Sequence, residues 1–191
     1  MEDLGLDPKL VDKSLDFKKV NDNKKKLYAA LDLGTNSCRM LIARPTGSRF
    51  EIVDAFSKSI RLGLDLERTG ELSQAGISRA LQALHVCAKK LNKFGVRNSR
   101  LVATEACRRS KNGKSFLSKV KKETGLTLEL IKPEEEARLA VISCAPLFDP
   151  NFSHVLIVDI GGGSTELVWM DLSEVPKEKR IAEMLKLQLG F

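Results

Sequence analysis

Apolar residues along this 191-residue chain recur at two spacings, one typical of strands and one typical of helices. Apolar positions three or four residues apart in residues 73–94 predict one face of a helix, which Gly95 ends. Two further helices are expected, one capped by Asn112 and ended by Gly125, and one opened by Pro133 and running to about residue 147. Short apolar runs between turn residues predict strands at residues 27–33, 38–44, 50–56, 101–103 and 127–131.

Residues 155–170 predict a hairpin built around a run of glycines. One apolar run leads into Asp159, and a second apolar run follows Glu166. The three glycines between them let the backbone approach a ligand closely and aim several N–H groups at one anion, such as phosphate. Because the two carboxylates would repel a bare phosphate, a divalent cation is the natural companion. A glycine-rich hairpin with a surface acid at each end is the alternative.

The same pattern occurs near the N-terminus. A strand at residues 27–33 carries Asp32 near its end, Gly34 and polar turn residues follow, and an apolar run at residues 40–43 returns. One Asp-x-Gly hairpin is weak evidence, whereas two of them, with aspartates 127 residues apart, indicate related half-sites that face one ligand. A chain of phosphates held from both sides is the expected ligand.

The predicted elements follow one another as three strands, then alternating helices and strands, then a final strand pair. This is the order of the ribonuclease H-like domain of the actin and sugar-kinase superfamily, an α/β fold, with the last strands starting a second, incomplete copy. We therefore expect a flexible leader at residues 1–26, a first domain at residues 27–150 and the start of a second at residues 151–191. The charged loop at residues 63–70 is expected to be exposed, and a strand is expected near residues 184–189.

Composition and residue spacing exclude several classes of protein. The apolar fraction of 42% supports a folded chain, and no apolar run approaches the ~18 residues of a membrane span. The N-terminus has no hydrophobic signal core, so a cytoplasmic location with no membrane partner is expected. The four cysteines form no C-x-x-C pair and the two histidines are isolated. This pattern indicates neither a zinc site nor a disulfide framework, and free thiols in or near the core are expected.

The net charge of +7 is unevenly distributed, because residues 89–122 hold 12 basic residues and one acidic residue. A basic block of this kind raises the local concentration of a polyanion, and salt weakens the effect. The block lacks the interleaved aromatic residues that favour nucleic acid as a partner. A solvated helix face with no partner is the alternative for most of these lysines.

Four motifs together are specific enough to indicate a family. They occupy residues 32–39, 103–108, 135–139 and 159–166 and read DLGTNSCR, ATEACR, EEARL and DIGGGSTE. In order and approximate spacing they resemble the exopolyphosphatase and guanosine pentaphosphate phosphatase family, from about residue 27 to the C-terminus. The resemblance implies a two-domain fold with the active site in the cleft between domains. It also implies hydrolysis of a terminal phosphoanhydride, usually with Mg²⁺.

The resemblance implies roles for individual side chains as well. Glu136 matches the family's proposed general base, and Glu166 matches a second acid that helps place water or metal. Asp32 and Asp159, together with Glu166, would hold Mg²⁺ directly or through water. The residues implied to bind phosphate are Gly34, Thr35, Asn36, Ser37, Arg39, Arg108, Gly161, Gly162, Gly163 and Ser164. Such a set suits phosphoryl transfer, which needs positioning and charge neutralisation more than covalent catalysis.

Several of these assignments have structural alternatives. Arg39 could be an outward residue of a strand, and Arg109 competes with Arg108, which motif alignment favours. Glu136, like the two glutamates before it, could serve only to stabilise the helix, because a negative charge interacts favourably with the positive end of the helix dipole. Two other motif residues are expected to support structure instead of touching substrate: Glu105 and Arg138.

The expected function is hydrolysis of terminal phosphoanhydride bonds in inorganic polyphosphate or guanosine pentaphosphate, with this chain as an N-terminal portion of the enzyme. Family members continue beyond Phe191, so the 191 residues alone are expected to have little or no phosphatase activity. A non-catalytic polyphosphate-binding or polyanion-binding remnant and one half of a split phosphatase are the alternatives. A homodimer and a separately encoded C-terminal half are both open as partners. A sugar or acetate kinase relative is more distant, since no adenosine-binding motif is present.

Overall fold

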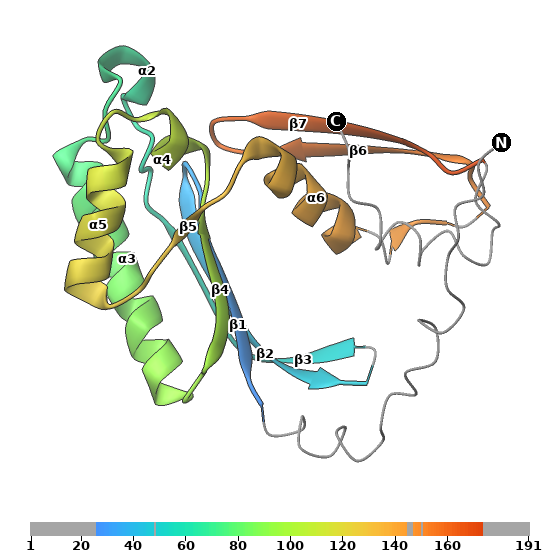
Figure 1. The fold of residues 1–191 in the computed structure, drawn as a ribbon, viewed down its shortest axis with the longest axis horizontal. Coiled ribbons are helices and arrows are strands. Elements are labelled where there is room, and N and C mark those ends of the chain that lie inside the picture. The colour runs from blue at the N-terminus through green and yellow to red at the C-terminus, as the bar shows by residue number, and fades with distance from the viewer. Residues whose placement is uncertain (1–25, 48, 145–146, 150, 174–191) are drawn as a thin grey trace, which may run out of the picture.

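A mixed five-stranded sheet forms the centre of the larger part of the protein (Figure 1). The computed structural model describes residues 26–47, 49–144, 147–149 and 151–173, so most of the predicted leader and the strand expected near residues 184–189 lie outside the described residues. The strand order is β3-β2-β1-β4-β5, with β1, β2 and β3 antiparallel and β1, β4 and β5 parallel. The strands are β1 (Tyr28–Leu33), β2 (Ser37–Thr46), β3 (Arg49–Ser59), β4 (Asn98–Ala103) and β5 (Glu129–Leu130).

Two helices, α3 (Gln74–Lys93) and α5 (Gly113–Thr124), cover one face of this sheet (Figure 1). Alternate residues of β1, such as Leu31 and Leu33, point into the core beneath these helices, because successive strand residues face opposite sides. The same alternation turns Asp32 to the other side of the sheet. Among the residues that the structure describes, no helix has the length and the apolar run that a membrane crossing needs.

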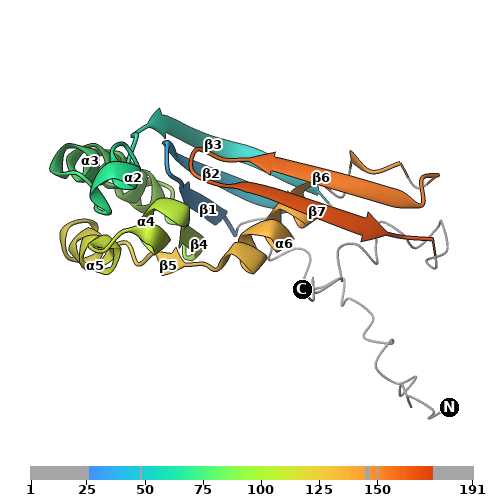
Figure 2. The ribbon, with the colours of Figure 1, turned by 90° about the horizontal axis from the view of Figure 1, so that it is seen from above.

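A second, smaller hydrophobic cluster lies on the opposite side of the sheet. Helix α6 (Pro133–Cys144) packs there against a hairpin of β6 (His154–Ile160) and β7 (Thr165–Asp171) (Figures 1 and 2). Ala137 and Val141 of the helix meet the inner face of the hairpin at Ile157, Val168 and Met170. The helix that ends the predicted first domain therefore packs on the strands of the predicted second, and the domain division stays a prediction.

Several elements differ from the sequence-based expectation. The charged loop expected at residues 63–70 contains a one-turn helix, α2 (Leu66–Thr69), because Leu66 is buried in the main core. A second short helix, α4 (Glu105–Arg109), follows β4 directly, with Ala106 and Cys107 buried. The strand expected at residues 127–131 is reduced to the two residues of β5. Three of the four free cysteines are buried, as the spacing suggested.

Asn112 does not cap α5, which corrects the expectation from sequence. It occupies the capping position, but its side chain makes no capping hydrogen bond. The Asn112 side chain instead accepts from the backbone N–H of Leu72 at 2.9 Å and donates to the carbonyl of Leu72 at 3.0 Å. Because Leu72 is buried, these two bonds satisfy a backbone donor and acceptor that water does not reach.

Replacement of Asn112 by Ser distinguishes the two roles. Serine caps helices about as well as asparagine, so a capping role predicts almost no change in stability. The shorter serine cannot reach both backbone groups of Leu72, so we expect a loss of about 1–3 kcal/mol in the free energy of unfolding, measured by urea denaturation. Asn92→Ser is the control, because the Asn92 side chain is exposed and makes no hydrogen bond within the described residues. An unchanged Asn112→Ser protein would restore the capping interpretation.

Candidate functional site

The β1–β2 turn and the β6–β7 turn are closed by the same type of backbone hydrogen bond. In the first, the N–H of Gly34 donates to the carbonyl of Ser37 at 2.9 Å, and in the second, the N–H of Gly161 donates to the carbonyl of Ser164 at 2.9 Å. The strand registers correspond as well, since Asp32 pairs with Arg39 and Asp159 pairs with Glu166. The two predicted half-sites thus have the same backbone geometry and differ in the residue opposite the aspartate.

The two turns face one another closely enough that their glycines cannot carry side chains without movement. A Cβ atom added to Gly162 would lie 2.5 Å from the Asn36 side-chain nitrogen, and one added to Gly163 would lie 2.7 Å from the Thr35 hydroxyl. Both turns lie at the end of the molecule that also carries α2 and α4 (Figures 1 and 2). Residues that are remote in sequence therefore meet at one place.

The segment after β3 supports the first turn from behind. The N–H groups of Ile60 and Arg61 donate to the Asn36 carbonyl at 2.8 and 3.0 Å, and the N–H of Gly63 donates to the Thr35 carbonyl at 3.0 Å. A side chain at Gly63 would collide with the Thr35 methyl group. The carbonyl groups of Thr35 and Asn36 are thus fixed by backbone donors of the protein.

A cavity of about 370 Å³ lies between the turns. Thirteen of the fourteen predicted site residues line it, and Arg108 is the exception. The lining residues on the main sheet are Asp32, Gly34, Thr35, Asn36, Ser37 and Arg39, and those on α6 and the hairpin are Glu136, Asp159, Gly161, Gly162, Gly163, Ser164 and Glu166. The structure thus gathers the residues of all four motifs around one space, although their roles there stay predictions.

The three glutamates at the start of α6 have different surroundings. Glu134 is exposed, and Glu135 forms ion pairs with Arg138 and Arg100, both at 2.7 Å. Hydrogen bonds from Arg138 and Arg100 lower the pKa of Glu135 to about 2. Glu136 alone of the three faces the cavity. Arg138 holds Glu135 and does not line the cavity, as expected for a supporting residue.

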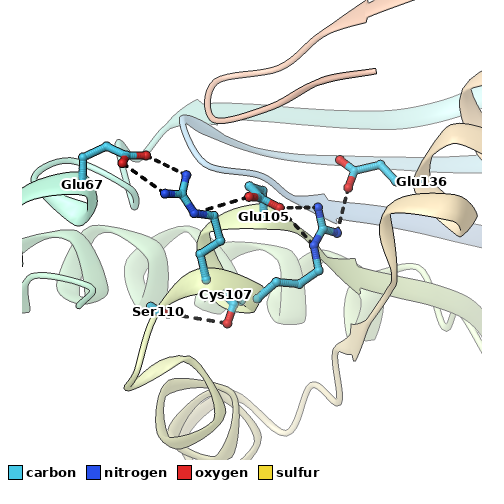
Figure 3. A network of polar contacts seen from close by, with 7 residues as sticks. Glu67, Glu105, Cys107, Ser110 and Glu136 are labelled. Carbon is cyan, nitrogen blue, oxygen red and sulfur yellow. Dashed lines mark hydrogen bonds and ion pairs between the residues drawn. The ribbon is translucent and has the colours of Figure 1, made fainter. Parts of the chain in front are cut away.

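Two glutamates, Glu105 and Glu136, and a backbone carbonyl hold the Arg108 guanidinium. Figure 3 shows the two glutamates with the arginine between them. Arg108 donates to Glu136 at 2.8 Å, to the carbonyl of Ile131 at 2.9 Å and to Glu105 at 2.7 and 3.1 Å. The predicted contact of Arg108 with phosphate stays a prediction, since the structure shows this guanidinium occupied by protein acceptors.

Burial and neighbouring charges shift two carboxyl groups of the cavity. Desolvation raises the pKa of Asp32, Arg39 opposes that effect, and the charge of Asp159 adds to it. Desolvation also raises the pKa of Glu136, against the lowering effect of Arg108, with smaller upward contributions from Glu166 and Asp32. Asp32 and Glu136 are therefore each affected by carboxylates from other elements of the cavity wall, and perturbed carboxyl groups of this kind are common at functional sites.

Within the described residues, no three histidine, cysteine or acidic side chains are gathered closely enough to form a ready metal centre. Asp32, Asp159 and Glu166 nevertheless line the same cavity with their oxygen ligands. Such an open set of oxygen ligands fits Mg²⁺, which keeps several waters and is bound by one or two carboxylates plus substrate phosphates. It does not fit zinc, which prefers a closed set of nitrogen and sulfur ligands.

Three residues of the cavity wall were not predicted as site residues, and one of them is the apolar Ile160 at the end of β6. Thr104 is buried and Glu105 is mostly buried, and both line the cavity where β4 passes into α4. The position of this segment, just beyond the carboxyl end of a buried strand, is the signal that could have indicated them.

Comparison with known proteins agrees with this geometry. The sequence profile described as the Ppx/GppA phosphatase family matches residues 41–183, about three quarters of the chain. The chain belongs to the Ppx/GppA phosphatase family. The family resemblance inferred from the four motifs is therefore confirmed.

Solved structures of Ppx/GppA proteins share the fold of this chain. The family member from Aquifex aeolicus is 30% identical with a TM-score of 0.66, and the match covers 83% of this chain and 58% of the relative. An exopolyphosphatase from Cytophaga hutchinsonii is 26% identical with a TM-score of 0.71, and the match covers 78% of this chain and 47% of the relative. The α/β ribonuclease H-like fold class is confirmed, and the chain spans about half the length of these relatives.

A designed disulfide tests whether the two turns of this Ppx/GppA chain face one another in solution. The Cβ atom of Thr35 lies 3.3 Å from a Cβ built on Gly163, close to the ~3.5–4.5 Å of a disulfide. We expect the Thr35→Cys, Gly163→Cys double variant to form an intramolecular bond under mild oxidation, seen as a mass decrease of about 2 Da and loss of two alkylatable thiols. The control pairs Thr35→Cys with Leu167→Cys on the exposed outer face of the hairpin. Equal oxidation of both pairs would contradict the arrangement.

Proposed function

We propose that this chain supplies the active-site residues for hydrolysis of a terminal phosphoanhydride bond in inorganic polyphosphate or guanosine pentaphosphate. The strongest support is that two Asp-x-Gly turns with the same backbone hydrogen bond face each other across one cavity. Arg39 and Glu136 line the same cavity. A phosphate chain fits such a site because it presents oxygens to both walls.

Phosphate oxygens would be bound by the backbone N–H groups of the two turns and by Arg39. Turn backbones with several N–H groups aimed at one point bind anions without side-chain charge. Arg39 adds a guanidinium that lines the cavity and is suited to charge-assisted, bidentate contact with phosphate. The glycines of the second turn permit the close approach that such binding requires.

Glu136 would act as the general base. Its carboxylate lines the cavity, and its pKa lies above the ordinary glutamate value because of burial, which makes it a better proton acceptor than an exposed glutamate. One oxygen, Oε2, accepts from Arg108, so Oε1 is the atom that would orient the attacking water and accept its proton. Glu166, on the opposite wall, would help to place that water.

Asp32, Asp159 and Glu166 would hold Mg²⁺ together with phosphate oxygens. When bound, the cation neutralises charge on the phosphates and so lowers the barrier to phosphoryl transfer. Its charge would also relieve the repulsion between Asp32 and Asp159, which contributes to the raised pKa of Asp32. Removal of the metal by a chelator is therefore expected to weaken phosphate binding as well as hydrolysis.

A non-catalytic polyanion-binding role rests on the basic block at residues 89–122. Its exposed lysines on α3 and α5 favour such a role. Ion pairs, however, engage Lys90, Arg100, Arg108, Arg109 and Lys119 with neighbouring acids. Five of the twelve basic residues of the block are therefore balanced locally, and hydrolysis at the cavity is the better supported function.

Glu136→Gln is expected to lower phosphate release by about 100-fold or more, because glutamine cannot accept the proton of the attacking water. The measurement is Mg²⁺-dependent release of phosphate from polyphosphate, made under single-turnover conditions because slow turnover is expected. Glu134→Gln is the matched control, since Glu134 lies two residues away on the same helix but is exposed. Binding that is salt-sensitive and independent of metal, without any release, would favour the non-catalytic role instead.

The pH dependence of phosphate release is expected to report the raised pKa of Glu136. A general base must be deprotonated, so the rate should rise with pH through the pKa of Glu136 and level off above it. The midpoint of this acid limb is expected above the ordinary value of 4.5, because desolvation outweighs the effect of Arg108. A midpoint at or below 4.5 in the single-turnover rate would contradict this assignment.

A further inference from the structure

An uninterrupted series of ion pairs leads from the protein surface to the cavity (Figure 3). Glu67 of α2 pairs with Arg109 at 2.6 Å, Arg109 lies 3.6 Å from Glu105, Glu105 pairs with Arg108 at 2.7 Å, and Arg108 pairs with Glu136 at 2.8 Å. The exposed fraction of the side chains falls from 78% at Glu67 to 18% at Glu105 and 13% at Arg108. The inner members are thus shielded from water and the outer members are not.

Glu105 controls the orientation of the Arg108 guanidinium. A single oxygen of Glu105, Oε2, accepts from Nε at 3.1 Å and from Nη2 at 2.7 Å, so it holds one edge of the planar group. The other terminal nitrogen, Nη1, is then directed at the carbonyl of Ile131 and at Oε2 of Glu136. Because the guanidinium is rigid and flat, fixing its first edge fixes the direction of Nη1.

Glu136 in turn is held by one of its two oxygens. Arg108 binds Oε2, and within the described residues no hydrogen bond is donated to Oε1. If Arg108 were free to rotate, it could bind both oxygens of Glu136 in the bidentate manner that arginine and carboxylate groups prefer. The anchor at Glu105 therefore keeps one Glu136 oxygen available.

We propose that Glu105 is a positioning residue, which acts through Arg108 to keep the Oε1 atom of Glu136 free for the attacking water. The inference rests on the proposed role of Glu136 as general base. It assigns a function to a glutamate that sequence reasoning placed among the supporting residues. Glu67 and Arg109 have no such role, because exposed ion pairs are worth little and Arg109 makes no hydrogen bond to Glu105 within the described residues.

The test compares Glu105→Gln with Glu67→Gln in single-turnover phosphate release from polyphosphate with Mg²⁺. Glutamine at position 105 has the size of glutamate but no charge, so it loses the charge-assisted bonds to Arg108, and Arg108 should turn toward Glu136. We expect the maximal rate to fall roughly 10- to 100-fold while the half-saturating polyphosphate concentration changes by less than about twofold. Glu67→Gln should change neither quantity. An equal loss in both variants, or a change in half-saturation alone, overturns the inference.

A second measurement does not depend on turnover. In protein labelled with ¹⁵N at arginine, the Nε–H group of Arg108 should exchange slowly with solvent in the wild type and in Glu67→Gln, and rapidly in Glu105→Gln. Unchanged exchange in Glu105→Gln overturns the inference, whether or not the chain releases phosphate.

The two proposals fail in different ways. If Glu136→Gln releases phosphate as fast as the wild type, the general-base assignment is wrong, and with it the inference. If Glu136→Gln is inactive but Glu105→Gln keeps the wild-type rate, only the positioning role of Glu105 is wrong.

Discussion

The close approach of the β1–β2 turn to the β6–β7 turn is the contact on which the rest of the site depends. The turns belong to different sheets and are separated by more than a hundred residues of chain, yet side chains of Thr35 and Asn36 reach the backbone of Gly162 and Gly163. This contact requires glycine on one side, and on the other it requires a turn that is held from behind by the segment around Gly63. Without it, each half would be an ordinary hairpin with one aspartate.

The packing of α6 explains how the catalytic candidate reaches this contact. The helix is fixed to the hairpin by Ala137 and Val141, and ion pairs from Glu135 fix it to the main sheet through Arg100. Glu136 lies between these two attachments. Its position relative to both turns is therefore set by packing on one side and by charge on the other, which is how rigid elements place a reacting group with the required accuracy.

The sequence was sufficient for the elements whose patterns are long or rigidly constrained. The spacing of apolar residues identified α3, Pro133 identified the start of α6, and the two Asp-x-Gly patterns identified both turns. The two short helices were not predicted, because α2 depends on one buried leucine and α4 on two small residues in contact with the core. The bond of Asn112 to Leu72 and the bond of Arg108 to Glu136 were not predicted either, since a side chain that bonds to a residue 40 or 28 positions away leaves no local pattern.

The residue that pairs with each aspartate across the hairpin makes the two walls of the cavity differ in charge. The two walls are built alike, but the position that pairs with Asp32 is Arg39 and the position that pairs with Asp159 is Glu166. Within the described residues, one wall thus places an arginine opposite its aspartate, whereas the other places a second carboxylate there. The electrostatic potential therefore differs between the two walls although their turns are built alike. A terminal phosphate carries more negative charge than the phosphate next to it in the chain, so the difference between the walls makes it unequal in energy which of the two lies against the Arg39 wall.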